Sequence, residues 1–177
     1  LTSQLAPPGT VRHRPKCERM KTPLIFDGHN DALFRLFRAG GDPVELFQRD
    51  VGNLNVPAAA RGGFAGGLFA MFALGEGRGL DFSIFANVPY DSPLPEPLEQ
   101  GEALRQTIAQ AGIAHRLAEA GHGQFCLTGV DVHQAMAGEK MALVLHLEGA
   151  EAIGPDLLEL DALYALGLRS LGPVWSR

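Results

Sequence analysis

The sequence predicts a parallel α/β fold, because short apolar runs typical of strands alternate along the chain with amphipathic segments typical of helices. With 177 residues, 46% of them hydrophobic, the chain is long enough for one domain with a substantial core. It has neither a Gly-x-Gly-x-x-Gly motif between a strand and a helix nor a Gly-x-x-x-x-Gly-Lys-Ser/Thr motif, so nothing supports a nucleotide-binding sheet. The alternation itself leaves two architectures open, a doubly wound sheet and a barrel.

The first predicted strand is the apolar run at residues 24–26, which ends abruptly in the polar residues Asp-Gly-His-Asn-Asp at 27–31. Residues 32–39 are amphipathic and predict a short helix, and the Gly-Gly-Asp-Pro sequence at 40–43 ends it. We expect an ordered loop from there to about residue 62.

Gly66 and Gly67 are expected to open a second strand, which covers the apolar residues 68–73. Residues 76–97 are rich in Gly, Pro and Asp, so they predict a surface excursion. A long helix is expected over residues 98–120, with an apolar face made of Leu104, Ile108, Ala111 and Leu117.

Further along the chain, residues 124–127 predict a short strand, and Thr128 and Asp131 have the spacing of a capping box for a helix at 130–137. The strand signal at residues 141–147 is strong. A helix at 157–166, with Pro155 near its first turn, and a last strand at 168–175 complete the pattern.

Composition narrows the class of partners and the compartment. The formal net charge is -5 and there is no basic block, which argues against nucleic acid, and no apolar run reaches the roughly 18 residues of a membrane helix. The two cysteines, Cys17 and Cys126, fit a reducing compartment. Residues 1–21 lack the apolar centre of a signal peptide, so we expect a disordered leader, a domain at 22–177 and a cytoplasmic protein.

His29 and Asp31 are two residues apart on an extended segment, so strand alternation points both side chains to the same side. An imidazole and a carboxylate at a strand end can bind one divalent metal ion and leave open positions for water. The same short pattern also fits a solvated turn, and the motif alone leaves both interpretations open.

His146 and Glu148 end the most hydrophobic strand and share one face, while Leu143, Leu145 and Leu147 take the other. A carboxylate at the end of a buried strand is costly unless it is paired or bound to a cation, so we predict that Glu148 is a metal ligand. One carboxylate can offer an oxygen to each of two ions. We interpret His146 as a hydrogen-bonded histidine just behind the ligands or a histidine of the core.

Several short motifs follow one another in a specific order: Asp-Gly-His-Asn-Asp at 27–31, Arg-Gly-Gly at 61–63, Gly-Ile-Ala-His-Arg at 112–116, His-Leu-Glu-Gly at 146–149 and Gly-Leu-Arg-Ser-Leu at 167–171. In order and spacing, residues 22–177 resemble the membrane (renal) dipeptidase family of zinc metallopeptidases, particularly its bacterial branch. The resemblance implies a (β/α)₈ barrel (a TIM barrel) with its site at the carboxyl ends of the strands. Because such a barrel takes roughly 250 residues, we expect this chain to supply the N-terminal half, strands one to four.

The resemblance also implies a site with two zinc ions, in which His29 and Asp31 bind the first ion and Glu148 bridges both. In that chemistry a hydroxide shared by the two ions attacks the peptide bond of a dipeptide, which makes Glu148 catalytic. Trp175 stands where well-known members have a substrate-binding histidine, so we assign it to the substrate region. This departure leaves the substrate's identity open.

The family's second ion needs two histidines from later strands, and the chain ends at Arg177. We therefore expect the full-length protein to be an active metallodipeptidase and the isolated chain to be inactive, with an open sheet edge that favours association between copies or misfolding. One alternative is a truncated, catalytically inactive fragment. Another is a related metal-dependent amidohydrolase with a different amide substrate, although most of those begin with His-x-His rather than His-x-Asp.

Overall fold

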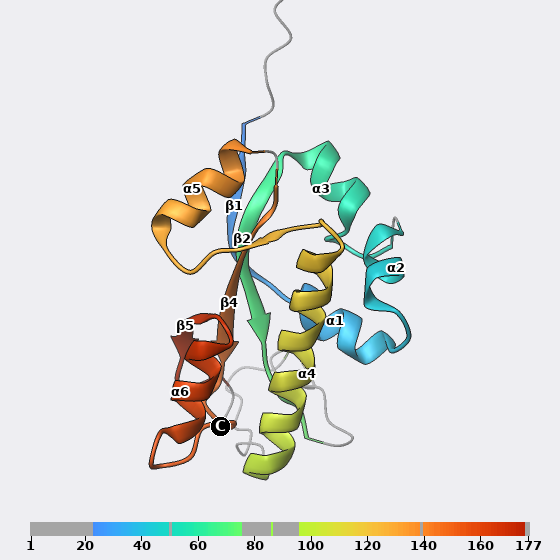
Figure 1. Ribbon diagram of the computed structural model, residues 1–177. Coiled ribbons are helices and arrows are strands. Elements are labelled where there is room, and N and C mark those ends of the chain that lie inside the picture. Colours follow the sequence, from blue (N-terminus) through green and yellow to red (C-terminus); the bar gives the residue numbers. More distant parts are fainter. Residues whose placement is uncertain (1–22, 50, 76–85, 87–95, 139, 176–177) are drawn as a thin grey trace, which may run out of the picture.

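The computed structural model describes residues 23–49, 51–75, 86, 96–138 and 140–175, so the leader expected at 1–21 and most of the surface excursion expected at 76–97 lie outside the described residues. Strands and helices alternate along the described part (Figure 1). In chain order they are β1 (Ile25–Asn30), α1 (Ala32–Ala39), α2 (Pro43–Gln48), α3 (Val56–Gly62), β2 (Phe64–Met71), α4 (Gln100–Glu119), β3 (Gln124–Phe125), α5 (Gly129–Ala137), β4 (Ala142–Glu148), α6 (Leu158–Ala165) and β5 (Leu168–Gly172).

The strands form one sheet in which every pairing among the described residues is parallel, which confirms the predicted α/β class. The order is β1-β2-β4, and both β3 and β5 pair with the far edge of β4. The two-residue strand β3 pairs with the amino end of β4, and β5 pairs with its carboxyl end. The four longer strands therefore lie in chain order, without the reversal of a doubly wound sheet, as expected for part of a (β/α)₈ barrel.

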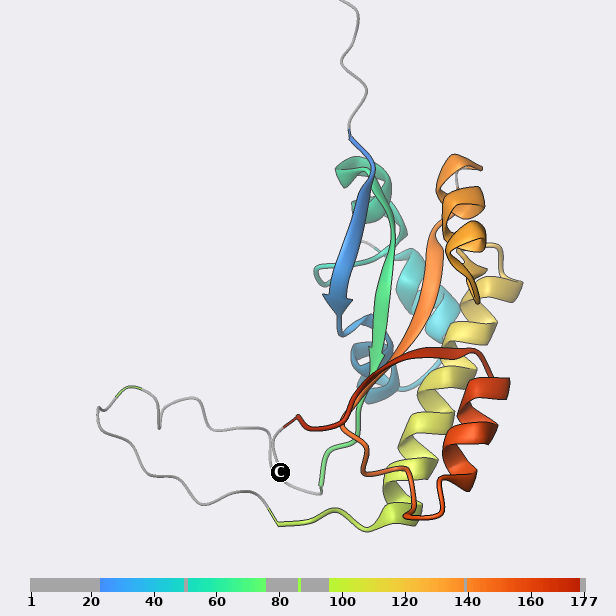
Figure 2. The ribbon, with the colours of Figure 1, turned by 90° about the vertical axis from the view of Figure 1, so that its left-hand side faces the viewer.

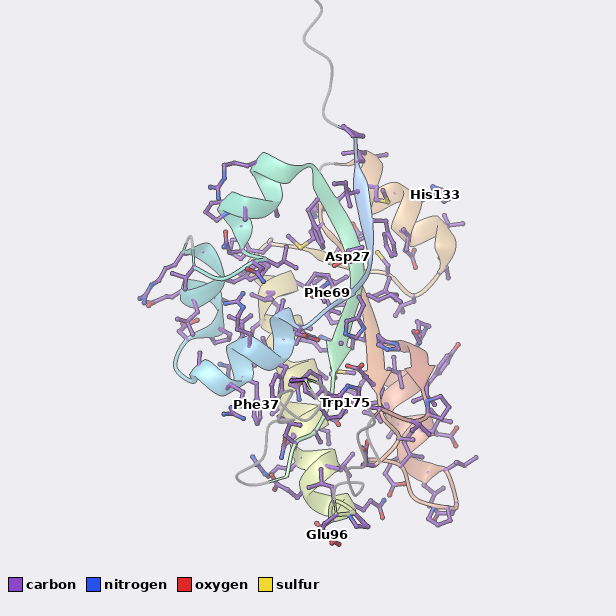
Figure 3. The ribbon with its side chains drawn as sticks, turned by 180° about the vertical axis from the view of Figure 1, so that it is seen from behind. Asp27, Phe37, Phe69, Glu96, His133 and Trp175 are labelled. Atoms are coloured by element: carbon purple, nitrogen blue, oxygen red, sulfur yellow. The ribbon has the colours of Figure 1, made fainter. Side chains whose placement is uncertain are left out.

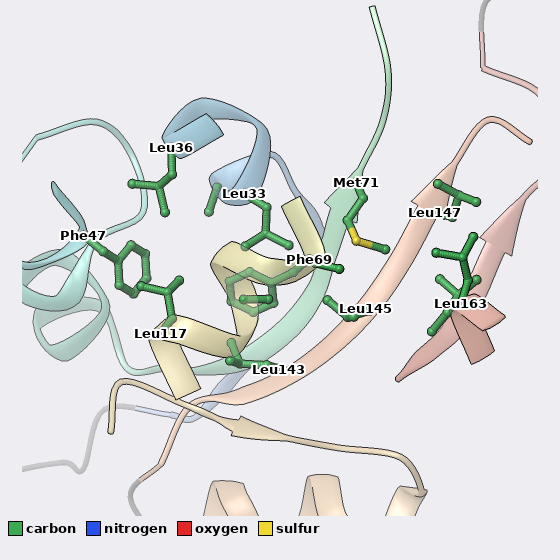
Figure 4. Packing of buried hydrophobic residues seen from close by; sticks show 14 residues of the cluster. Leu33, Leu36, Phe47, Phe69, Met71, Leu117, Leu143, Leu145, Leu147 and Leu163 are labelled. Carbon is green, nitrogen blue, oxygen red and sulfur yellow. The ribbon is translucent and has the colours of Figure 1, made fainter. Parts of the chain in front are cut away.

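The main core lies between one face of this sheet and helices α1, α4 and α6 (Figure 4). Figure 2 shows α4 and α6 along the same side of the sheet. The buried strand residues of this core alternate as strand geometry requires: Phe69 and Met71 on β2, and Leu143, Leu145 and Leu147 on β4. Helix α5 packs on the other face, where Ala135 joins Ala142 and Val144 in a small cluster. His146 and Glu148 continue that second face towards the carboxyl ends of the strands.

Gly66 and Gly67 lie inside β2, which begins two residues earlier at Phe64, whereas the sequence predicted that they open the strand. A Cβ atom on Gly66 would lie 2.5 Å from the Cβ of Ala142, and one on Gly67 would lie 2.8 Å from the carbonyl oxygen of Asp27. Both distances are shorter than real side chains tolerate. The two glycines therefore let β2 approach β4 on one side and β1 on the other.

The stretch expected to be a loop up to residue 62 contains the two short helices α2 and α3. The Asp42 carboxylate accepts hydrogen bonds from the backbone N–H groups at the start of α2, and Pro43 follows it. The Asn55 side chain accepts one from the N–H of Ala58 at the start of α3, close to Pro57. An N-cap residue followed closely by proline is a helix start signal. The loop prediction was wrong because Pro43 was interpreted only as the end of the preceding helix and the Asn55–Pro57 signal was overlooked.

The buried face of α4 is more polar than the sequence predicted, since Ile108 is 47% exposed while Gln106 and Gln110 are buried. The Gln110 amide donates to the carbonyl of Phe72 (2.7 Å) and accepts from its N–H (3.3 Å). Gln106 does the same for Leu74, at 3.0 and 3.1 Å. The chain just beyond β2 thus has its backbone paired by two side chains, which satisfies polar groups that burial would otherwise leave unpaired.

The carboxyl-terminal elements are shorter than expected. Helix α6 begins at Leu158, after Leu157 in a left-handed conformation (φ 63°), so Pro155 precedes the helix rather than lying in its first turn. Strand β5 ends at Gly172 because Pro173 has no N–H to pair, and Trp175 lies beyond the strand. Within the described ranges, no helix combines the length and apolar character needed to cross a membrane.

Replacing Gly66 with alanine should destabilise the protein by about 1–3 kcal/mol, because the new methyl group meets the backbone and side chain of Ala142. Gly112→Ala is the matched control: Gly112 lies inside α4 with nothing within 4 Å of an added Cβ, so this change should stabilise by up to about 1 kcal/mol through helix propensity. Urea denaturation measures both free energies of unfolding. Equal effects of the two substitutions would contradict the proposed close approach of β2 and β4.

Thr128 and Asp131 form the expected capping box at the start of α5. Hydrogen bonds from Thr128 and from the N–H of Leu127 lower the pKa of Asp131, with a smaller contribution from the charge of Arg169. The box is therefore stabilising above the usual carboxyl range, and that stabilisation is lost as the pH falls through the lowered pKa. Asp131→Ala should destabilise at pH 7, by more than Asp131→Asn, which keeps an acceptor oxygen. Both differences from the original protein should shrink in urea titrations below pH 3.8, and a constant difference down to the lowest pH would rule out this role of the carboxylate.

Candidate metal centre

Three side chains that the sequence singles out converge where β1 and β4 end. His29 Nε2 lies 3.2 Å from Asp31 Oδ1 and 3.5 Å from Glu148 Oε2. One ligand atom from each of the three residues lies within 4.8 Å of the other two. The side chains of His29 and Asp31 are 42% and 60% exposed and that of Glu148 is 22% exposed, so the group is open to an ion from solvent.

The end of β1 is held by Asn30, which lies between the two candidate ligands. Its amide donates to the carbonyl of Leu68 on β2 (3.2 Å) and its carbonyl accepts from the N–H of Ala32 at the start of α1 (3.3 Å). Asp27 accepts from the N–H of His29 at 3.2 Å. Asp31 occupies the N-cap position of α1 without making a side-chain capping bond, so its carboxylate stays available. The sequence interpretation did not assign a role to Asn30, although its place at a strand-to-helix junction is the kind of signal that marks a bridging amide.

The electrostatics of the group favour a cation. Burial raises the pKa of Glu148, and the Asp31 charge adds to this effect while His29 opposes it. Both carboxylates converge on the same atom, His29 Nε2, so their charges lie close together with a single ring nitrogen between them. Imidazole nitrogen and carboxylate oxygen are common zinc ligands, so this set of donors fits a divalent ion of that kind.

His146 lies beside the group. Its ring is 5.7 Å from the ring of His29, centroid to centroid, and nearly perpendicular to it at 76°. Its Nδ1 lies 2.8 Å from the hydroxyl oxygen of Ser170 on β5. Burial lowers the pKa of His146, and His29 contributes to the same shift. Ser170 was not singled out from the sequence, although it lies in the Gly-Leu-Arg-Ser-Leu motif.

Trp175 lies in an aromatic cluster by the carboxyl end of β2 (Figure 3). Its ring packs on Phe72 at a centroid distance of 5.3 Å, and Phe72 stacks on Phe34 at 4.0 Å. The structure thus brings His29, Asp31 and Glu148 together with His146 beside them, and gives Trp175 aromatic neighbours instead.

A hollow of about 520 Å³ adjoins the candidate ligands on the side of β1. Asp27, His29 and Asp31 line it together with Arg35 from α1. This volume is within the range of pockets that take small molecules. A small ligand in the hollow would therefore lie against two of the three candidate metal ligands.

Comparison with known proteins identifies the family. The family model for membrane dipeptidase (peptidase family M19) matches residues 17–177. An uncharacterised protein in the PQQ-III 3′ region of Acinetobacter calcoaceticus is 38% identical over 159 residues, which cover 86% of this chain and 49% of that protein.

Two crystal structures are also similar. A metallo peptidase from Rhodobacter sphaeroides, liganded with a phosphinate mimic of the dipeptide L-Ala-D-Ala, matches with a TM-score of 0.79 and 36% identity over 89% of this chain and 47% of that one. The dipeptidase AC, a metallo peptidase of family M19, matches with a TM-score of 0.78 and 37% identity, over 89% of this chain and 46% of that one.

The chain thus spans about half the length of the relatives that it matches. The family match runs through β1, which carries His29, and through β4, which carries Glu148. The resemblance inferred from the short motifs is confirmed: this chain belongs to the membrane dipeptidase family of peptidases, family M19.

Proposed function

We propose that the complete protein is a zinc-dependent dipeptidase, and that this chain supplies half of its (β/α)₈ barrel with three of its metal ligands. The observation that carries the proposal is the convergence of His29, Asp31 and Glu148 within 4.8 Å at the carboxyl ends of parallel strands. Active sites of such barrels are built at this end. The similar Rhodobacter sphaeroides enzyme holds a dipeptide mimic, which supports a dipeptide as substrate.

Exposed apolar side chains at both edges of the sheet support the proposal that the barrel continues beyond these strands. Leu24, Ile25 and Phe26, on and just before β1, are 60%, 48% and 39% exposed. Leu171 on β5 is 38% exposed and Val174 is 72% exposed. Apolar side chains along two open edges favour pairing with further strands, which in a closed barrel would come from the other half of the protein. Without that half, the same edges favour association between copies.

In the proposed centre, His29 and Asp31 would hold one zinc ion, and Glu148 would contribute its carboxylate to that ion and to a second one. The described residues offer a single group of three such ligands, so a second ion needs further ligands, and the family resemblance implies two histidines from later strands. Zinc ions bound there would polarise the peptide carbonyl and lower the pKa of the water that attacks it.

Residues of this chain hold the candidate zinc ligands in place before a substrate binds. Asn30 fixes the strand end between His29 and Asp31, so the two ligands need little rearrangement to share an ion. Glu148 is the least exposed of the three ligands, so its charge is the one that most needs a cation. The hollow beside β1 gives a small substrate access to the same ligands.

Glu148→Gln in the full-length protein tests the proposal, because glutamine keeps the size of the side chain and removes the charge. We expect the zinc content to fall by at least one ion and kcat/KM for L-Ala-D-Ala to fall by about 100-fold or more. Elemental analysis and hydrolysis of L-Ala-D-Ala and L-Ala-L-Ala measure the two effects.

Glu45→Gln is the matched control, because the Glu45 side chain is 66% exposed on α2 and pairs with Arg49. It should leave zinc content and turnover unchanged. Full zinc and full turnover in Glu148→Gln would contradict the proposed centre. A zinc-loaded full-length protein that cleaves another amide and no dipeptide would favour the amidohydrolase alternative.

A further inference from the structure

We propose that His146 contacts the substrate: its Nε2–H donates a hydrogen bond to the carbonyl oxygen of the scissile peptide bond, and Ser170 holds the ring in place. The inference rests on the proposed dipeptidase function and adds a substrate-binding residue to it. His146 makes no covalent bond and binds no metal in this proposal.

The position of His146 in β4 places it beside the candidate ligands. Ala142 and Val144 precede it on the same face and are 0% and 9% exposed, so that face is filled below the histidine. Glu148 follows it on the same face, and the ring of His29 is 5.7 Å away. His146 is therefore the first residue along this face of β4 whose side chain borders the open group of candidate ligands.

Ser170 fixes which part of the imidazole is available. Residues His146 and Ser170 are partners in the register of β4 and β5, and the hydroxyl oxygen lies 2.8 Å from Nδ1. If the hydroxyl donates to Nδ1, the ring proton is on Nε2, which becomes a donor. Within the part of the chain that the structure describes, Nε2 makes no hydrogen bond of its own.

The neighbours of the ring leave that edge uncovered. Ala70 is the partner of His146 on β2, and Gly172 lies two residues beyond Ser170 on β5. A Cβ on Gly172 would be in van der Waals contact with the His146 ring, at 3.7 Å from Cε1 and 3.9 Å from Nε2. Because residue 172 is glycine, that position beside Nε2 is left for a substrate atom.

An N–H group in this place suits the charge that develops during hydrolysis. The carbonyl oxygen of a peptide bond gains negative charge when the carbonyl carbon is attacked, and a fixed donor stabilises the transition state more than the ground state. The competing explanation is purely structural: the His146–Ser170 bond merely joins β4 to β5. The two explanations differ in what happens when Nε2 alone is removed.

Two substitutions of His146 in the full-length, zinc-loaded protein distinguish the roles of the two ring nitrogens. His146→Asn places an amide oxygen near the position of Nδ1, so it can still accept a hydrogen bond from Ser170, and it removes Nε2. His146→Gln reaches the position of Nε2 and gives up the bond to Ser170. His133→Asn, on the exposed face of α5, is the control.

We expect His146→Asn to lower kcat for L-Ala-D-Ala by about 100-fold with a small change in KM and unchanged zinc content, since the lost contact acts mainly in the transition state. The kcat of His146→Gln should be about 10-fold higher than that of His146→Asn. Ser170→Ala should lower kcat by about 10-fold relative to the original protein, because the ring is less well oriented. A purely structural bond would produce the opposite order, with His146→Asn the milder change.

Nitrogen-15 NMR of the imidazole gives a readout that does not depend on turnover. We expect the proton on Nε2 in the free protein, and a shift of the Nε2 resonance when a phosphinate mimic of L-Ala-D-Ala binds. A proton on Nδ1, or an unperturbed Nε2, would overturn the inference, as would full activity or loss of zinc in His146→Asn. If the original protein cleaves no dipeptide, the proposed function itself fails, which is a distinguishable result.

Discussion

Strand β2 touches both of its neighbours at Gly66 and Gly67, and the relative position of His29 and Glu148 depends on that contact. Gly67 is the register partner of Asp27 on β1 and of Leu143 on β4, so one residue of β2 aligns the two strands that carry the candidate ligands. No side chain larger than hydrogen fits between these backbones. A wider spacing would move the imidazole away from the Glu148 carboxylate, because the two groups come from strands that do not pair with each other.

The same alignment creates an electrostatic cost that an ion can remove. Glu148 is partly buried and lies near a second carboxylate, and both raise its pKa, so its ionised form is disfavoured unless a cation pairs with it. Asp31 differs in position: it stands at the N-cap of α1, is more exposed and makes no side-chain capping bond. Glu148 is therefore the carboxylate that gains most when a cation arrives.

Sequence periodicity predicted the features that depend on neighbours in the chain. The helix at 32–39 and the capping box at Thr128 follow from local patterns, and the parallel sheet follows from the alternation of elements. The candidate ligands also followed from pattern, because the carboxyl ends of parallel strands meet at one edge. Residues whose role depends on distant partners were missed: Asn30 bonds a carbonyl 38 residues away, and Ser170 bonds a histidine 24 residues away. The two glycines were misplaced for the same reason, since only the neighbouring strands show why they lack side chains.

The glutamine pair on α4 makes the hydrogen-exchange protection of the chain just beyond β2 depend on a helix. The N–H groups of Phe72 and Leu74 are held by side chains of Gln110 and Gln106 rather than by a neighbouring strand. Their exchange with solvent deuterium would then be governed by the opening of α4, and not by fraying of the strands beside them. Because Phe72 also packs against Trp175, the bonds of Gln110 to Phe72 tie α4 to the aromatic cluster by the carboxyl end of β2.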